Sequence, residues 1–316
     1  MENSKIAFIF PGQGSQYSGM GKELYKDFKE SRDVFDEASH ILGIDMARLC
    51  FENHERQLCE TENTQIAILT HSISALRVVE RYGIRPNVVA GLSLGEYSAI
   101  VSSGRLDFNN SIKLVRKRGI YMEEASRHIN GGMAAILGLD RCEVLKICNE
   151  CSGKSGLEIV QIANYNCPGQ IVISGEINAL KKACEMAKDK GAARVVPLNV
   201  KGPFHSSLLN MAAEKLEIDL ENTKFNKGTI PLIANITADY IDDNKIREVL
   251  KRQVTSSVRW EDTISRMIKD GIDIFIEIGP GRVLSGFIKK INNKMQVYNV
   301  EDKKSLEKTL KALKLG

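Results

Sequence analysis

The sequence carries little net charge and few aromatic residues. Its 44 basic residues are nearly balanced by 40 acidic residues, which leaves a formal net charge of +4, and aromatic residues make up only 6% of the chain. The lysines and arginines are scattered and are not interleaved with aromatics, as a nucleic-acid-binding platform would require. We therefore expect no nucleic-acid partner.

Long hydrophobic runs are missing as well. No apolar stretch approaches the roughly 20 residues that a membrane-spanning helix needs, so we expect no membrane partner. No secretory signal precedes the apolar residues Phe8, Ile9 and Phe10, and the seven cysteines are an odd number. These features predict a cytoplasmic protein whose cysteines stay reduced and act as small apolar residues.

Metal-ligand patterns are sparse. Cys148 and Cys151 form a CxxC pair near Cys142, but no second pair exists and no histidine lies nearby to complete a tetrahedral site. We interpret these cysteines as one face of a helix that begins near Asp140, and we expect no metal.

Strand-like and helix-like segments alternate along the 316 residues, which is typical of an α/β fold with a largely parallel sheet. The predicted strands cover residues 5–10, 87–91, 230–235 and 273–279, and the predicted helices cover 22–42, 64–82, 94–104, 109–127, 246–254 and a last segment from Lys303.

The middle of the chain departs from this order. Between residues 130 and 198 the pattern is strand, helix from Arg141, two strands, helix from Asn178 and a last strand. This βαββαβ order is typical of a ferredoxin-like subdomain. We therefore predict a discontinuous catalytic core of residues 1–128 and 198–316, with residues 129–197 as an inserted ferredoxin-like subdomain.

The stretch Gly91-Leu92-Ser93-Leu94-Gly95 fits the pattern G-x-S-x-G between a predicted strand and a predicted helix. A nucleophile elbow has this context, because its tight turn exposes a strained serine and leaves no room for side chains at the flanking glycines. A glycine-rich turn without chemistry remains the alternative.

A nucleophilic serine needs a base, for which histidine is the usual partner. His205 lies in a loop and follows Ser93 in the chain, as in α/β-hydrolase sites, so we predict it as the general base. The other four histidines fit solvated, boundary or core positions: His40, His54, His71 and His128.

Two further positions fit the same chemistry. The glycine-rich stretch 10–21 lacks a P-loop ending, and backbone N–H groups near Gln13 suit an oxyanion hole better than a phosphate cradle.

Helical spacing places Arg118 on the apolar side of its helix with Leu114 and Met122. An arginine that faces inward needs an anionic partner.

Seven motifs follow one another between residues 10 and 281: FPGQGSQ, GLSLGEYSA, VRKRG, GGMAAILGL, IANYNCPGQIVISG, VKGPFHS and FIEIGPG. In this order they resemble the malonyl-CoA:acyl carrier protein transacylase family of bacterial fatty-acid synthesis over nearly the whole chain. The resemblance implies an α/β-hydrolase-like core with an inserted ferredoxin-like subdomain.

The resemblance also implies the reaction. The malonyl group moves from malonyl-CoA to the phosphopantetheine thiol of acyl carrier protein through a malonyl-serine, without a metal or redox cofactor, and we expect a monomer. The implied site residues are the nucleophile Ser93, the base His205, the carboxylate-binding Arg118, the oxyanion-hole residues Gln13 and Leu94, and Gln253, whose carbonyl orients the histidine.

One position departs from the family pattern, because many members have histidine where this chain has Leu92. Phe204, directly before His205, resembles the residue at this place in malonyl-selective members, where the side chain crowds the α-carbon of branched substrates. The sequence leaves three other functions open: an acyltransferase serving polyketide carrier domains, a serine esterase, and a non-catalytic carrier-binding module.

Overall fold

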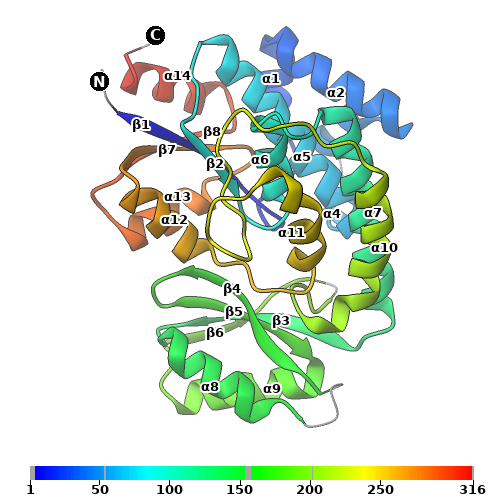
Figure 1. Cartoon of the computed structure of the whole chain (residues 1–316), viewed down its shortest axis with the longest axis vertical. Helices are drawn as coiled ribbons and strands as arrows, with labels where there is room; N and C mark the ends of the chain where they lie inside the picture. Colours follow the sequence, from blue (N-terminus) through cyan, green and yellow to red (C-terminus); the bar gives the residue numbers. More distant parts are fainter. Residues whose placement is uncertain (1–3, 53–54, 154–157, 201, 315–316) are drawn as a thin grey trace.

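A computed structural model describes residues 4–52, 55–153, 158–200 and 202–314. Two four-stranded sheets organise the chain, a parallel one in the upper part of the view and an antiparallel one in the lower part (Figure 1). This arrangement confirms the predicted fold class, an α/β core with a separate ferredoxin-like antiparallel unit.

The parallel sheet has the order β2-β1-β7-β8. Its strands are β1 (Lys5–Phe10), β2 (Val88–Gly91), β7 (Ile272–Ile278) and β8 (Gln296–Val300). Because side chains alternate along a strand, Phe8 and Phe10 enter the core on one face of the sheet, whereas Ala7 and Ile9 enter the core on the other. Phe10 pairs with Gly91, so β1 and β2 end together at the same edge of the sheet.

Helices cover both faces of this sheet (Figure 1). On the side of Phe8 and Phe10 the main helices are α5 (Thr61–Arg81), α6 (Gly95–Ser102) and α7 (Phe108–Arg127). On the side of Ala7 and Ile9 they are α12 (Trp260–Lys269) and α13 (Val283–Ile291). The remaining helices of the core are α1 (Lys22–Asp27), α2 (Lys29–Leu42), α3 (Met46–Phe51), α4 (Glu55–Leu58), α10 (Asn210–Asn222), α11 (Ile246–Gln253) and α14 (Lys303–Ala312), with short 3-10 turns η1 (Ser207–Leu209) and η2 (Asp243–Lys245).

Two predicted elements differ from the structure. The predicted helix 22–42 is divided at Phe28, whose backbone is extended between α1 and α2. The predicted strand 230–235 is reduced to isolated bridges of Leu232 with Val89 and Ile233 with Tyr240. Pro231 has no N–H for a ladder, and the backbone N–H of Asn235 donates to a side chain, so this segment cannot continue as a regular strand.

The antiparallel sheet has the order β4-β5-β3-β6, which is that of a ferredoxin-like βαββαβ unit. Its elements are β3 (Gly131–Leu137), α8 (Arg141–Cys151), β4 (Val160–Cys167), β5 (Gln170–Glu176), α9 (Ile177–Asp189) and β6 (Arg194–Pro197). The helices α8 and α9 cover its outer face (Figure 1). Cys148 and Cys151 are buried in this unit, but Cys142 is exposed, so the prediction of one shared face is wrong for Cys142.

The antiparallel unit is bonded directly to the core. Tyr165 N donates to Val258 O at 2.9 Å, and Val258 N donates to Ala163 O at 2.8 Å. Both guanidinium ends of Arg141 donate to the carboxylate of Asp262, at 2.8 and 3.1 Å. All four strands of the unit lie within residues 131–197, and we propose residues 129–197 as the inserted subdomain.

Candidate active site

Ser93 lies in a tight turn between β2 and α6. Its φ of 53° is the left-handed conformation that non-glycine residues rarely adopt. A Cβ on Gly91 would lie 2.0 Å from the carbonyl of Gly95, and a Cβ on Gly95 would lie 2.1 Å from Phe10 O. The glycines of the motif are therefore required by close backbone packing within the turn and against β1.

Asn235 stabilises this turn from a distant segment. Its Oδ1 accepts from Ser93 N at 2.7 Å, and its Nδ2 donates to Gly91 O at 2.6 Å. Asn235 was not predicted from the sequence, because no local pattern shows that residues 142 positions apart are in contact.

Among the histidines that the structure describes, His205 contacts Ser93. The distance from Ser93 Oγ to His205 Nε2 is 2.7 Å, and His205 Nδ1 lies 2.8 Å from Gln253 O. A carbonyl oxygen only accepts, so Nδ1 carries the proton and donates to Gln253. Nε2 then has a free lone pair that accepts from the Ser93 hydroxyl.

The environment of His205 keeps it neutral. Burial lowers the pKa of His205 to about 4, and the positive charge of Arg118 acts in the same direction. At neutral pH the imidazole is therefore unprotonated, which is the form that a general base needs. His205 also has a positive φ of 58°, so both members of the pair have a strained backbone.

Arg118 of α7 is 1% exposed, and its guanidinium faces Ser93. Its Nη2 donates to Ser93 Oγ at 3.3 Å and to Gln253 Oε1 at 3.1 Å. Its Nη1 donates to Gln65 Oε1 at 2.7 Å, and its Nε is buried without a partner among the described residues. Burial lowers the pKa of Arg118, which is the cost of holding a cation inside the protein.

The structure places Gln13 and Leu94 beside Ser93 in the wall of one chamber. In the part of the chain that the structure describes, neither Gln13 N nor Leu94 N donates to a protein acceptor. Two free N–H groups next to a nucleophile are what an oxyanion hole consists of.

Glu96 is a second site residue that was not predicted from the sequence. It lies in α6, whose residues are all buried, and it accepts from Gln253 Nε2 and from Asn235 N. An acidic residue directly before the largely apolar stretch YSAIV was the available signal, because a buried carboxylate needs partners.

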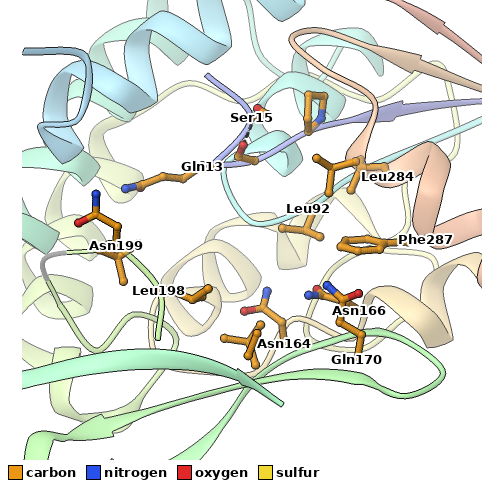
Figure 2. A pocket seen from close by; sticks show the side chains of 17 residues that line it. Gln13, Ser15, Leu92, Asn164, Asn166, Gln170, Leu198, Asn199, Leu284 and Phe287 are labelled. Atoms are coloured by element: carbon orange, nitrogen blue, oxygen red, sulfur yellow. Dashed lines mark hydrogen bonds between the residues drawn. The ribbon is translucent and has the colours of Figure 1, made fainter. Parts of the chain in front are cut away.

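Two cavities adjoin at this site. A chamber of about 90 Å³ reaches Ser93, His205 and Arg118. A larger cavity of about 410 Å³ extends from it between loop 11–15, α13 and the antiparallel sheet. Both share Gln13, Leu92, Asn164, Leu198 and Val200. Figure 2 shows the Leu92 side chain beside Phe287. Leu92 lines both cavities, so the residue that departs from the family pattern lies where they meet.

Three other histidines that the structure describes do not line the chamber at Ser93. His71 is buried in α5 with Nε2 2.9 Å from Glu301 O, whereas His40 and His128 are exposed. His54 lies outside the described residues. Over those same residues, no three His, Cys, Asp or Glu side chains are grouped as a metal site would require, and no helix is long and apolar enough to cross a membrane.

Comparisons with known proteins point to one family. The family model of the acyl transferase domain matches residues 7–308. The malonyl CoA-acyl carrier protein transacylase of Bacillus subtilis (strain 168) is 46% identical over 312 residues, which are 98% of each chain. The crystal structure of malonyl CoA-acyl carrier protein transacylase from Clostridium perfringens has a TM-score of 0.94 and 47% identity, covering 98% of both chains.

A further solved structure contains a malonyl-transacylase in complex with its type II PKS acyl-carrier protein. It has a TM-score of 0.94 and 39% identity, covering 98% of this chain and 100% of that one. By sequence and by structure over nearly its full length, the chain belongs to the family of malonyl CoA-acyl carrier protein transacylases.

Proposed function

We propose that the protein transfers the malonyl group from malonyl-CoA to the phosphopantetheine thiol of an acyl carrier protein in fatty-acid synthesis. The observation that carries the proposal is the pairing of a Ser93–His205 hydrogen bond with a buried guanidinium 3.3 Å from the same Ser93 oxygen. A serine esterase has no use for that cation, whereas a malonyl group brings a carboxylate for it.

In the first half-reaction Ser93 Oγ attacks the thioester carbonyl of malonyl-CoA, and its proton passes to His205 Nε2. The oxygen that becomes negative accepts from the N–H groups of Gln13 and Leu94. The C–S bond then breaks, and the CoA sulfur leaves with the proton from His205. Gln253 O, 2.8 Å from Nδ1, stabilises the imidazolium that exists between these steps.

The second half-reaction reverses the first with a different thiol. The phosphopantetheine thiol gives its proton to His205 and attacks the malonyl ester, and Ser93 leaves with that proton. The two substrates use the same serine in turn, so the kinetics are ping-pong. The larger cavity next to Leu92 supports this scheme, because it gives a long substituent on sulfur a route to Ser93.

Arg118 holds the malonyl carboxylate in this proposal. A guanidinium presents N–H groups in a fixed fork that meets both carboxylate oxygens, and its buried Nε lacks another partner among the described residues. Holding this end of the substrate also orients the thioester toward Ser93.

The acyl carrier protein is the proposed macromolecular partner, by analogy with the complex of a malonyl-transacylase with its acyl-carrier protein. Because that complex contains a type II PKS acyl-carrier protein, a polyketide carrier is the second candidate partner. A competition assay, in which both carrier types are offered to the malonylated protein, distinguishes the two. We further propose that the protein works as a monomer in the cytoplasm, where its seven free cysteines remain reduced.

The test is intact-protein mass spectrometry after mixing with malonyl-CoA. We expect one malonyl adduct in the wild-type protein and none in Ser93→Ala. The adduct should disappear when holo acyl carrier protein, which carries the phosphopantetheine group, is added. An adduct that persists in Ser93→Ala, or that maps to a cysteine, would contradict the proposal.

A further inference from the structure

Glu96 is a buried carboxylate that the proposed reaction does not use directly. It lies one turn after Ser93 at the start of α6 and is 1% exposed. Both of its oxygens accept hydrogen bonds from N–H donors: Oε1 from Asn235 N at 3.1 Å, and Oε2 from the side-chain amide of Gln253. Neither donor can accept in return.

Gln253 connects Glu96 to each of the proposed reacting groups. Its Nε2 also donates to Ser93 O at 2.9 Å. Its Oε1 accepts from Arg118 Nη2 at 3.1 Å, and its main-chain oxygen accepts from His205 Nδ1 at 2.8 Å. The position of one buried glutamine therefore affects the nucleophile, the base and the cation together.

The charge of Glu96 determines which way the Gln253 amide points. A carboxylate only accepts, so it holds the NH₂ end of the amide and leaves the oxygen toward Arg118. In the flipped amide the oxygen would face the carboxylate, and the NH₂ would face the guanidinium, so two acceptors and two donors would oppose each other. The negative charge of Glu96 also acts on Arg118 from within the same buried cluster.

We propose that Glu96 is a positioning residue of acyl transfer, which acts through Gln253 to hold Arg118 and His205 in the arrangement that selects malonyl. The inference rests on the proposed function. A purely structural role, in which Glu96 only ties the segment of Asn235 to α6, is the alternative that the experiment has to separate.

Glu96→Gln is the sharpest variant, because it keeps the shape of the side chain and replaces one charged acceptor oxygen by a neutral NH₂ donor. Its new NH₂ group has to face either Asn235 N or the NH₂ of Gln253, and the second option is relieved only by flipping Gln253 against Arg118. We expect kcat/KM for malonyl-CoA to fall about 10- to 100-fold, as for a lost buried hydrogen bond, and that for acetyl-CoA to fall less. Equal losses for both substrates, or none, would overturn the proposal.

The pH profile gives a readout that a structural role would not change. Burial raises the pKa of Glu96 to about 7, against the lowering effect of its two hydrogen bonds and of Arg118, whereas His205 has its pKa lowered to about 4. Tyr97, a further titratable group of the described residues that faces this cluster, has its pKa raised by burial to about 12. Protonating Glu96 removes an acceptor, so wild-type kcat/KM should fall as the pH drops through its titration.

In Glu96→Gln this decrease of kcat/KM, the acid limb of the pH profile, should be missing. Only the decrease at lower pH that comes from protonation of His205 should remain. An acid limb that is unchanged in Glu96→Gln contradicts the proposal. Glu277→Gln is the matched control, because Glu277 is a second buried carboxylate with a pKa raised to about 7, bonded to Leu284 N and Ser285 instead. It should leave the malonyl-to-acetyl ratio and the acid limb unchanged.

Gln253→Met provides a second test, which also applies if Glu96→Gln does not fold. It preserves the main-chain oxygen for His205 but removes the amide between Glu96 and Arg118. It should reproduce the loss of malonyl selectivity, and Glu96→Gln should add little in its background, since residues that act through one another are not additive. Additive losses would show that Glu96 does not act through Gln253.

Whether the wild-type protein forms the malonyl adduct distinguishes a failure of the proposed function from a failure of the role proposed for Glu96. If wild type forms no malonyl-serine, the proposed function fails. If wild type forms it and Glu96→Gln matches wild type in rate, selectivity and pH profile, only the role of Glu96 is wrong.

Discussion

Replacing Arg118 by alanine should convert a malonyl-selective enzyme into one that no longer distinguishes malonyl from acetyl. Malonyl has a free carboxylate that acetyl lacks, and the guanidinium of Arg118 is the cation that faces Ser93 in the 90 Å³ chamber. Truncation would leave the substrate carboxylate in a buried site without a partner. Acetyl transfer does not use this pairing and should fall much less, or rise.

The magnitude follows from the burial of this residue. Arg118 is 1% exposed, so its charge is scarcely screened by solvent. Truncating one side of a buried, hydrogen-bonded charge pair costs about 2–5 kcal/mol. At about 1.4 kcal/mol for each factor of ten, malonyl transfer should fall roughly 30- to several-thousand-fold. Arg118→Lys should recover only part of this loss, because an ammonium preserves the charge but not the fork.

The assay is kcat/KM for malonyl-CoA and acetyl-CoA in each variant, with thermal unfolding measured alongside. Arg105→Ala is the matched control, because Arg105 is also buried but pairs with Asp243 at 2.7 Å, on a segment outside the chamber. It should lower stability without changing the malonyl-to-acetyl ratio. Equal losses for both substrates in Arg118→Ala would refute the reasoning and leave Arg118 as a packed helix residue.

Two further predictions concern the base and the turn. His205→Ala should slow formation of the malonyl adduct about 10²–10⁴-fold with little change in thermal stability, whereas the same loss in a folded His71→Ala would show that the base was chosen wrongly. Gly95→Ala should destabilise the protein by about 1–3 kcal/mol or more, because its Cβ would lie 2.1 Å from Phe10 O; a denaturation midpoint equal to that of wild type would contradict this packing argument.

The local patterns of the sequence were sufficient for the fold class and for the elbow. Apolar runs such as 5–10 and 273–279 predict buried strands, and the alternation with amphipathic helices predicts a parallel sheet. Ser93 was predictable because a strand, two glycines and a helix all lie within a few residues of it. These signals are local, so one sequence contains them in full.

The residues that the sequence did not predict are those whose partners are distant. Asn235, Glu96 and Gln65 contact the site through hydrogen bonds to residues 53 to 157 positions away. The predicted strand 230–235 was wrong for the same reason, because Asn235 N donates to Glu96 and not to a neighbouring strand. Strand propensity describes the conformation that a segment prefers in isolation. Here the buried side chain of Glu96 accepts from a backbone N–H that a regular strand would use for pairing.

The pattern of unpaired donors gives a physical reason for substrate choice. Gln13 N, Leu94 N and Arg118 Nε belong to residues that line the chamber at Ser93, and none of these three N–H groups has an acceptor among the described residues. Burying a donor without an acceptor costs free energy in the protein alone, and a substrate that supplies acceptors at those points recovers it. Two of the donors suit the oxygen of a thioester under attack, and the third belongs to a cation. A substrate that carries both a thioester and a carboxylate satisfies all three, whereas acetyl-CoA leaves Arg118 Nε without an acceptor.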